Sequence, residues 1–110
     1  MRANALEQFI KSNTGITIAS HNFYDWEKKG LLGEIPRTGG NQRDYSERNA
    51  KRGALVAILL GEYWKFNEIV DLIVNKNPDL KERLITMVND IELKRVFTFR
   101  DIIKNWEVLI

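Results

Sequence analysis

The sequence feature that most constrains the fold is an unbroken apolar run, Ala54 to Leu60, near the middle of the chain. A helix that carries apolar residues at every position from Leu55 to Leu60 has no polar side to turn toward water. We therefore expect this helix to lie at the centre of the domain, with the other segments packed around it. The run is too short to cross a bilayer, which needs about 20 apolar residues.

Length and composition indicate a single compact domain around that helix. The chain has 110 residues, of which 44% are hydrophobic and 29% charged. A chain of this size buries about two-thirds of its unfolded surface, enough for one core without cross-links. The sequence contains no cysteine and a single histidine, which excludes a disulfide framework, a thiolate metal site and a cysteine nucleophile. No signal-peptide pattern opens the sequence, so we expect a cytoplasmic location.

Apolar spacing and helix-breaking residues predict a mainly α-helical chain with one small hairpin. Two short helices are expected at residues 3–12 and 20–30, each followed or ended by a glycine. Residues 31–45 contain three glycines and Pro36. This composition predicts a β-hairpin that turns at residues 38–41.

The second half of the chain is expected to be helical throughout. The long central helix should begin at Ser46 without a complete capping box, because residue 49 is asparagine. Three more helices are expected to begin at Asn67, Pro78 and Thr98.

Motifs for catalysis or metal binding are absent from the sequence. It contains no glycine-rich phosphate loop, no paired-carboxylate motif, no Ser-x-x-Lys pattern and no metal-ligand spacing. His21 could serve as a general base only with a partner group, and a histidine near a helix start is more often a surface or capping group. We therefore expect neither an enzyme nor a cofactor or metal site.

Basic residues concentrate in the first half of the chain. The segment from Lys28 to Arg52 holds seven lysines and arginines against three acidic residues, although the whole chain carries a net charge of only +2. A basic segment on a nearly neutral chain favours an anionic partner. A solvated surface of mixed charge is the alternative interpretation.

The expected order of elements is helix, turn, helix and hairpin, which is the order of a winged helix-turn-helix. In that architecture the second helix enters the major groove of DNA and the hairpin, or wing, contacts phosphates. Side chains that can hydrogen-bond to bases or phosphates stand at both places. The second helix and the turn before it offer Thr17, Ser20, His21, Asn22 and Tyr24, and the wing offers Arg37, Asn41, Gln42 and Arg43.

Three short segments resemble the DNA-binding domain of the MerR family of transcriptional regulators. Residues 24–32 (YDWEKKGLL) resemble the family's RYYExxGLL stretch, and residues 43–46 (RDYS) resemble its RxYS wing exit. Residues 59–69 (LLGEYWKFNEI) are similar to its LxxxGFSLxEI segment, with one extra residue. The resemblance extends over residues 18–73, which is about half of the chain.

The resemblance implies a winged helix-turn-helix domain over residues 1–78, followed by a helical extension over residues 79–110. By the same resemblance, Trp26 packs beneath the second helix. Gly30 then makes a left-handed turn that carries residues 31–32 into the core.

The resemblance also assigns roles at the surface. Lys28 lies on the outer side of the second helix, and Arg43 and Tyr45 lie where family members contact phosphates. For Tyr45, a core aromatic with a hydrogen-bonded hydroxyl is the alternative. Asp25 departs from the family, because it places a negative charge where a phosphate-contacting tyrosine is usual.

The last third of the chain differs most from the family. It has neither the cysteines of a metal sensor nor the length of a drug-binding domain, so we expect no small-molecule effector. An apolar stripe near its end either covers the core or forms a self-association surface, which would make the protein a homodimer. The residues predicted for self-association are Phe99, Ile103, Trp106 and Leu109.

These observations predict a sequence-specific protein that binds double-stranded DNA and acts as a small, repressor-like transcriptional regulator. An excisionase-type or partition-type architectural DNA-binding protein fits the same features. The alternative from another class is an adaptor that docks a partner protein on a winged-helix scaffold, and Asp25 on the second helix is its best support.

Overall fold

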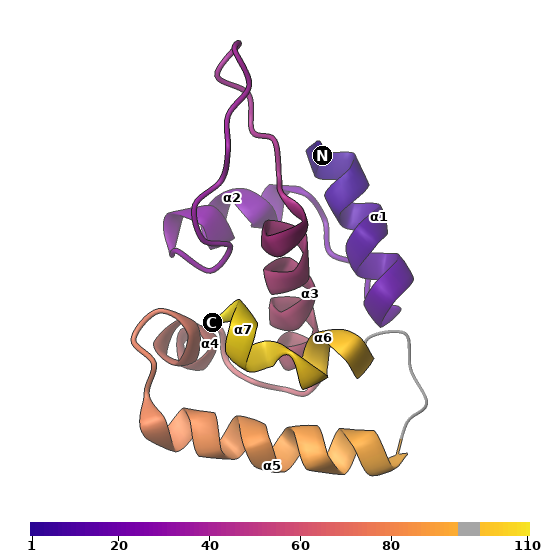
Figure 1. Ribbon diagram of the computed structural model, residues 1–110, viewed down its shortest axis with the longest axis vertical. Helices are drawn as coiled ribbons and strands as arrows, with labels where there is room; N and C mark the ends of the chain where they lie inside the picture. The colour runs from indigo at the N-terminus through magenta and orange to yellow at the C-terminus, as the bar shows by residue number, and fades with distance from the viewer. Residues whose placement is uncertain (95–99) are drawn as a thin grey trace.

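The computed structural model describes the backbone of residues 1–94 and 100–110, and the side chains of residues 1–90 and 102–110. Over these residues the chain is mainly helical, as predicted, and Figure 1 shows the helices arranged around α3. In this part of the chain no helix has the length and apolar character needed to cross a membrane. The helices are α1 (Ala3–Thr14), α2 (His21–Lys28), α3 (Glu47–Gly61), α4 (Phe66–Ile73), α5 (Pro78–Lys94), α6 (Arg100–Lys104) and α7 (Trp106–Leu109).

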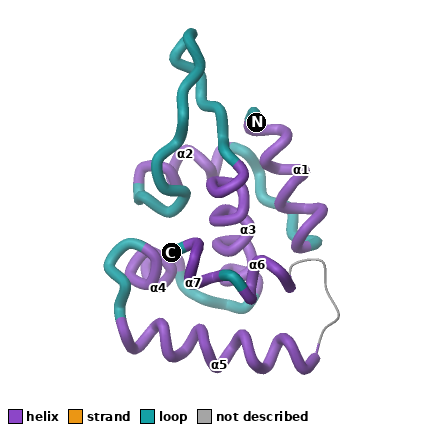
Figure 2. Tube along the Cα trace, in the orientation of Figure 1, coloured by secondary structure: helices purple, strands orange, loops and turns teal. Residues whose placement is uncertain are grey.

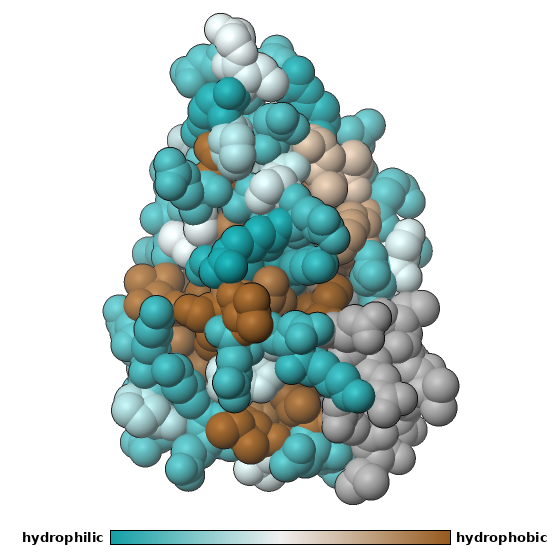
Figure 3. Space-filling model, viewed as in Figure 1, coloured by the Kyte–Doolittle hydropathy of each residue, from teal (hydrophilic) through white to brown (hydrophobic). Residues whose placement is uncertain are grey.

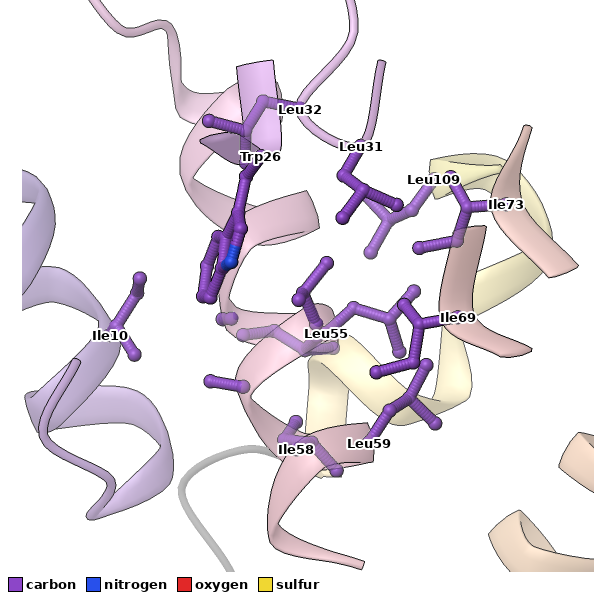
Figure 4. Packing of buried hydrophobic residues seen from close by; sticks show 14 of the residues in the cluster. Ile10, Trp26, Leu31, Leu32, Leu55, Ile58, Leu59, Ile69, Ile73 and Leu109 are labelled. Carbon is purple, nitrogen blue, oxygen red and sulfur yellow. The ribbon is translucent and has the colours of Figure 1, made fainter. Parts of the chain in front are cut away.

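Helix α3 is buried at the centre of the molecule, as its apolar sequence predicted. All of its residues from Gly53 to Leu59 are buried. Helix α1 packs along one side of it, and α4, α6 and α7 pack on its other sides. Figure 4 shows side chains from α1, α2, α4 and α7 converging on Leu55 and its neighbours.

A glycine allows α1 to approach α3 closely. A Cβ atom added at Gly53 would lie 3.3 Å from Ile10 Cδ1 and 3.8 Å from Leu6 Cδ1. Leu6 and Ile10 are both completely buried. Because interiors are close-packed, a larger residue at position 53 would push α1 away from the core.

The N-terminus of α3 is closed by a complete capping box, so the prediction of an incomplete one is wrong. The Ser46 hydroxyl accepts from the Asn49 N–H at 3.1 Å, and Asn49 Oδ1 accepts from the Ser46 N–H at 2.8 Å. The shorter asparagine thus does what glutamate or glutamine usually does. Asn49 Nδ2 also donates to the carbonyl oxygens of Leu32 and Glu34, at 2.7 and 2.9 Å. This buried side chain therefore joins α3 to the segment that follows α2.

The turn after α2 has the predicted form. Gly30 has φ +79°, in the left-handed region, and the next two residues, Leu31 and Leu32, are completely buried. Trp26 is also buried, so its side chain lies on the core side of α2, as expected. Arg52 of α3 holds the turn from the other side, because its Nε donates to the Leu31 carbonyl at 2.9 Å. Burial lowers the pKa of the Arg52 guanidinium.

The predicted β-hairpin is wrong as secondary structure. Residues 36–44 form a projecting loop, and Figures 1 and 2 show its tip extending beyond the helices. The described residues contain no β-strand, and a single antiparallel bridge joins Arg37 to Arg43. Two hairpin strands without a third strand or a helix against them are marginally stable in water, and Pro36 cannot donate to a ladder. The turn is nevertheless where the sequence placed it, because the Asn41 N–H donates to the Thr38 carbonyl at 2.9 Å.

The C-terminal helices complete the core of this chain. Ile103, Trp106 and Leu109 are buried, at 0%, 7% and 4% exposure, and α6 and α7 pack on α3. These three side chains are core residues, which corresponds to the core-covering alternative for the stripe, because the all-apolar part of α3 needs cover. Phe99 and the predicted helix start at Thr98 lie outside the described residues.

We expect Asn49→Ala to lower the free energy of unfolding by about 2–4 kcal/mol, because it removes half of the capping box and leaves one buried and one partly buried carbonyl without their donor. Urea denaturation followed by circular dichroism measures this loss. Asn89→Ala is the matched control, because Asn89 is exposed on α5. A loss below about 0.5 kcal/mol for Asn49→Ala, as expected of a surface site, would contradict the role of its hydrogen bonds.

We expect Gly30→Ala to lower the free energy of unfolding by about 1–2 kcal/mol, because a residue with a Cβ is strained at φ +79°. Gly40→Ala is the control, since a Cβ at Gly40 meets nothing within 4 Å and its φ is outside the left-handed region. Thermal denaturation compares the two. Equal melting temperatures would show that the turn after α2 tolerates another conformation.

Candidate nucleic-acid interface

Helix α2 and the projecting loop together form a cluster of charged and aromatic side chains. Two cations lie over one ring: Lys28 Nζ is 4.8 Å and Arg43 Cζ is 5.1 Å from the centroid of Tyr24. The Tyr24 residue is half exposed, so both cations stand at the surface. We call Tyr24, Glu27 and Lys28 of α2, with Arg37 and Arg43 of the loop, the Tyr24 cluster.

Glu27 links the two arginines of the loop to α2. Arg37 Nη2 donates to Glu27 Oε1 at 2.8 Å, and Arg43 Nε donates to Glu27 Oε2. The hydrogen bond to Glu27 is the main cause that raises the pKa of Arg43. One acid and three bases leave the cluster with a net positive charge, which suits a polyanion.

Tyr45 supports the cluster from below and is not part of its surface. It is buried, and its ring meets Phe23 edge to face at a centroid distance of 6.2 Å. Burial raises the pKa of the Tyr45 hydroxyl. These contacts correspond to the alternative interpretation of Tyr45 as a core aromatic, and a phosphate contact would need more exposure than it has.

The other predicted DNA-contacting residues of the second helix and its preceding turn are scattered around the start of α2. His21 is exposed, whereas the Asn22 side chain donates back to the Ala19 carbonyl at 3.1 Å. The Ser20 side chain does not cap α2, although its N–H donates to Glu7 Oε1 at 2.6 Å. The Thr17 hydroxyl accepts from Lys11 Nζ at 3.0 Å. None of these contacts brings the four residues into the Tyr24 cluster.

Two further candidates lie at the tip of the projecting loop. Asn41 and Gln42 are exposed, and Asn41 has φ +59°, a conformation that asparagine adopts more readily than most residues. Figure 3 shows mostly hydrophilic residues over the upper part of this face, where the loop stands. Hydrophobic residues gather across its middle, at the level of α4 and α7.

A groove runs beside the cluster between α2 and α4. Its volume is about 470 Å³, and its lining combines apolar side chains such as Leu60 and Phe66 with the charged Asp25 and Lys29. Asp25 is exposed at its edge, so it places a negative charge near the cations of α2. In the part of the chain that the structure describes, no three histidine, aspartate or glutamate residues come together to hold a metal ion.

A second group of the same residue types lies at the other end of the molecule. Arg83 of α5 stands 4.1 Å from the Trp64 ring centroid and donates to Glu68 Oε2 of α4 at 2.7 Å. The Glu68 carboxylate also accepts from the Lys65 N–H, and these bonds hold its pKa below the usual range. This pair has one arginine where the Tyr24 cluster has two arginines and a lysine, so it serves below as a reference.

The role of Glu27 is what sequence reasoning missed. Glu27 lies on α2, and its partners come from a loop 10 and 16 residues further on. The surplus of arginines in that loop was the available signal.

Comparison with protein-family models, with curated proteins and with solved structures finds no match to this chain. The resemblance to the MerR family therefore stays a prediction, carried by the three motifs.

We expect alkaline titration of the tyrosine absorbance to show one phase above the ordinary value of 10.0, because burial of Tyr45 disfavours its phenolate. Tyr45→Phe should remove that phase. Tyr63→Phe should leave it, because Tyr63 is 92% exposed. A titration of Tyr45→Phe that keeps the late phase would contradict the burial of this hydroxyl.

Proposed function

We propose that this protein binds double-stranded DNA and acts as a small transcriptional regulator of the repressor type. Helices α1 and α2 serve as the helix-turn-helix, and the projecting loop takes the place of the wing. The observation that carries the proposal is the Tyr24 cluster, in which Lys28, Arg37 and Arg43 stand on one surface shared by α2 and the loop. Arginine and lysine contacts to phosphates supply most of non-specific DNA affinity.

The proposed contacts divide between two elements. The exposed side chains of α2, with His21 and Tyr24 near its start, face the bases, and Arg37 and Arg43 face the sugar-phosphate backbone. The two tip glycines, Gly39 and Gly40, add little bulk where the backbone would pass close to DNA. A dimer would read two inverted half-sites, so a palindromic target depends on dimerisation.

The test is fluorescence anisotropy of a labelled random duplex of about 30 base pairs at several salt concentrations. Binding that is tight at low salt and weakens steeply as salt rises supports the proposal. Site selection from a random library then measures sequence specificity. An architectural protein would instead bend DNA, which the mobility of circularly permuted fragments detects.

We expect Arg43→Ala to weaken binding to all duplex sequences and to flatten the salt dependence by about one unit, because one phosphate contact is lost. Arg83→Ala is the matched control: it also removes an arginine that pairs with a glutamate and lies over an aromatic ring, but at α5. Equal effects of the two substitutions would mean that overall charge, and not the Tyr24 cluster, binds DNA.

A protein-interaction adaptor is the second candidate, and the exposed Asp25 at the edge of the α2–α4 groove favours it. If α2 faces DNA, Asp25→Lys should strengthen duplex binding, because it replaces repulsion by attraction. If α2 docks a protein, the wild-type chain will show no duplex affinity even at low salt.

A further inference from the structure

We propose that Arg37 and Arg43 form a phosphate-binding site that the Glu27 carboxylate occupies in the free protein, and that a phosphate of the duplex displaces it. This inference rests on the proposed function and adds a regulatory part to the same surface. Glu27 then acts as an internal competitor that lowers the affinity for DNA.

The geometry of the contact resembles phosphate recognition. Each carboxylate oxygen of Glu27 has its own arginine: Oε1 accepts from Arg37 Nη2 at 2.8 Å, and Oε2 accepts from Arg43 Nε. A phosphodiester group likewise offers two oxygens on one atom that share one negative charge. Guanidinium groups bind carboxylates and phosphates through the same paired hydrogen bonds. Two arginines that converge on one two-oxygen anion are therefore suited to either anion.

The two arginines are accessible enough to change partners. Their side chains are 38% and 32% exposed, and that of Glu27 is 20% exposed. Both arginines belong to the projecting loop, where one bridge joins its two arms and no strand ladder has to break. Figure 1 shows the loop extending beyond α2, so a rod-like partner can reach it alongside that helix.

The exchange is favourable for a polyanion in particular. Partly exposed ion pairs contribute little to stability and are screened by salt, so the arginines give up little when they leave Glu27. A duplex phosphate replaces the pair and also releases condensed counterions, which an isolated small anion cannot do. The displaced Glu27 stays on the same surface and repels the duplex. Its charge therefore reduces the affinity for every DNA sequence to a similar extent.

The decisive variant is Glu27→Gln, which keeps the shape of the side chain and removes its charge. We expect it to bind the random duplex about fivefold tighter or more near 0.1 M salt. We also expect a salt dependence about one unit steeper, because the surface that meets the phosphates loses one negative charge. Glu68→Gln is the matched control: it makes the same change in net charge at a glutamate that also pairs with an arginine beside an aromatic ring. It should leave both quantities unchanged.

Two results would overturn the proposal while leaving DNA binding intact. In the first, Arg43→Ala still weakens duplex binding, but Glu27→Gln binds the duplex no tighter than the wild-type chain does. Glu27 would then be a residue that positions the loop. The other is equal tightening by Glu27→Gln and Glu68→Gln, which would reduce the effect to net charge. Absence of duplex binding by the wild-type chain would overturn the proposed function as well.

A measurement on the wild-type chain covers the case in which Glu27→Gln does not fold. The ¹³C resonance of the Glu27 carboxylate, followed by NMR, should shift as duplex is added, because both of its arginines leave it. The Glu68 carboxylate resonance should stay in place, since Glu68 lies at α4, away from the loop. Saturated DNA binding with an unmoved Glu27 resonance would overturn the displacement.

Discussion

The absence of a polar side on α3 between Gly53 and Leu59 is the constraint on which the rest of the structure depends. A helix buried over seven consecutive positions, from Gly53 to Leu59, needs cover on every side. The chain supplies that cover from both directions along the sequence, with α1 and α2 before α3 and the C-terminal helices after it. Ile103, Trp106 and Leu109 near the end of the chain are buried in the core for this reason. The exposed polar side chains lie on the outer faces of the helices and on the projecting loop.

The position of the loop follows from how the ends of α3 and α2 are joined. Asn49 fixes the first turn of α3 to the carbonyls of Leu32 and Glu34, and Arg52 holds the turn at Leu31. Both ends of the projecting loop are therefore held near the first turns of α3. The residues between these ends have no core to pack on and project into solvent. Glu27 and its two arginines hold the base of the loop against α2. The result is a surface that combines a rigid helix with a lightly held loop.

The parts of this fold that the sequence predicted are those with local signals. Helix periodicity and the all-apolar run are read within a few residues, and Trp26, Leu31 and Leu32 are buried as the motif resemblance implied. Other features depended on distant partners. Asn49 completes its cap through geometry that residue type alone did not indicate, and the loop lacks the neighbouring strand that would have made it a hairpin. Of the candidate site, the sequence identified Tyr24, Lys28, Arg37 and Arg43, but not the carboxylate that unites them.

The close contact of α1 with α3 has a consequence for the order in which the chain can fold. Leu6 and Ile10 find their partner at Gly53, more than forty residues later in the sequence. During synthesis, the apolar faces of α1 and α2 therefore remain uncovered until α3 has emerged. The charged loop between α2 and α3 is made during that interval. Its arginines, which we assign to DNA binding, therefore emerge before the core that later positions them exists.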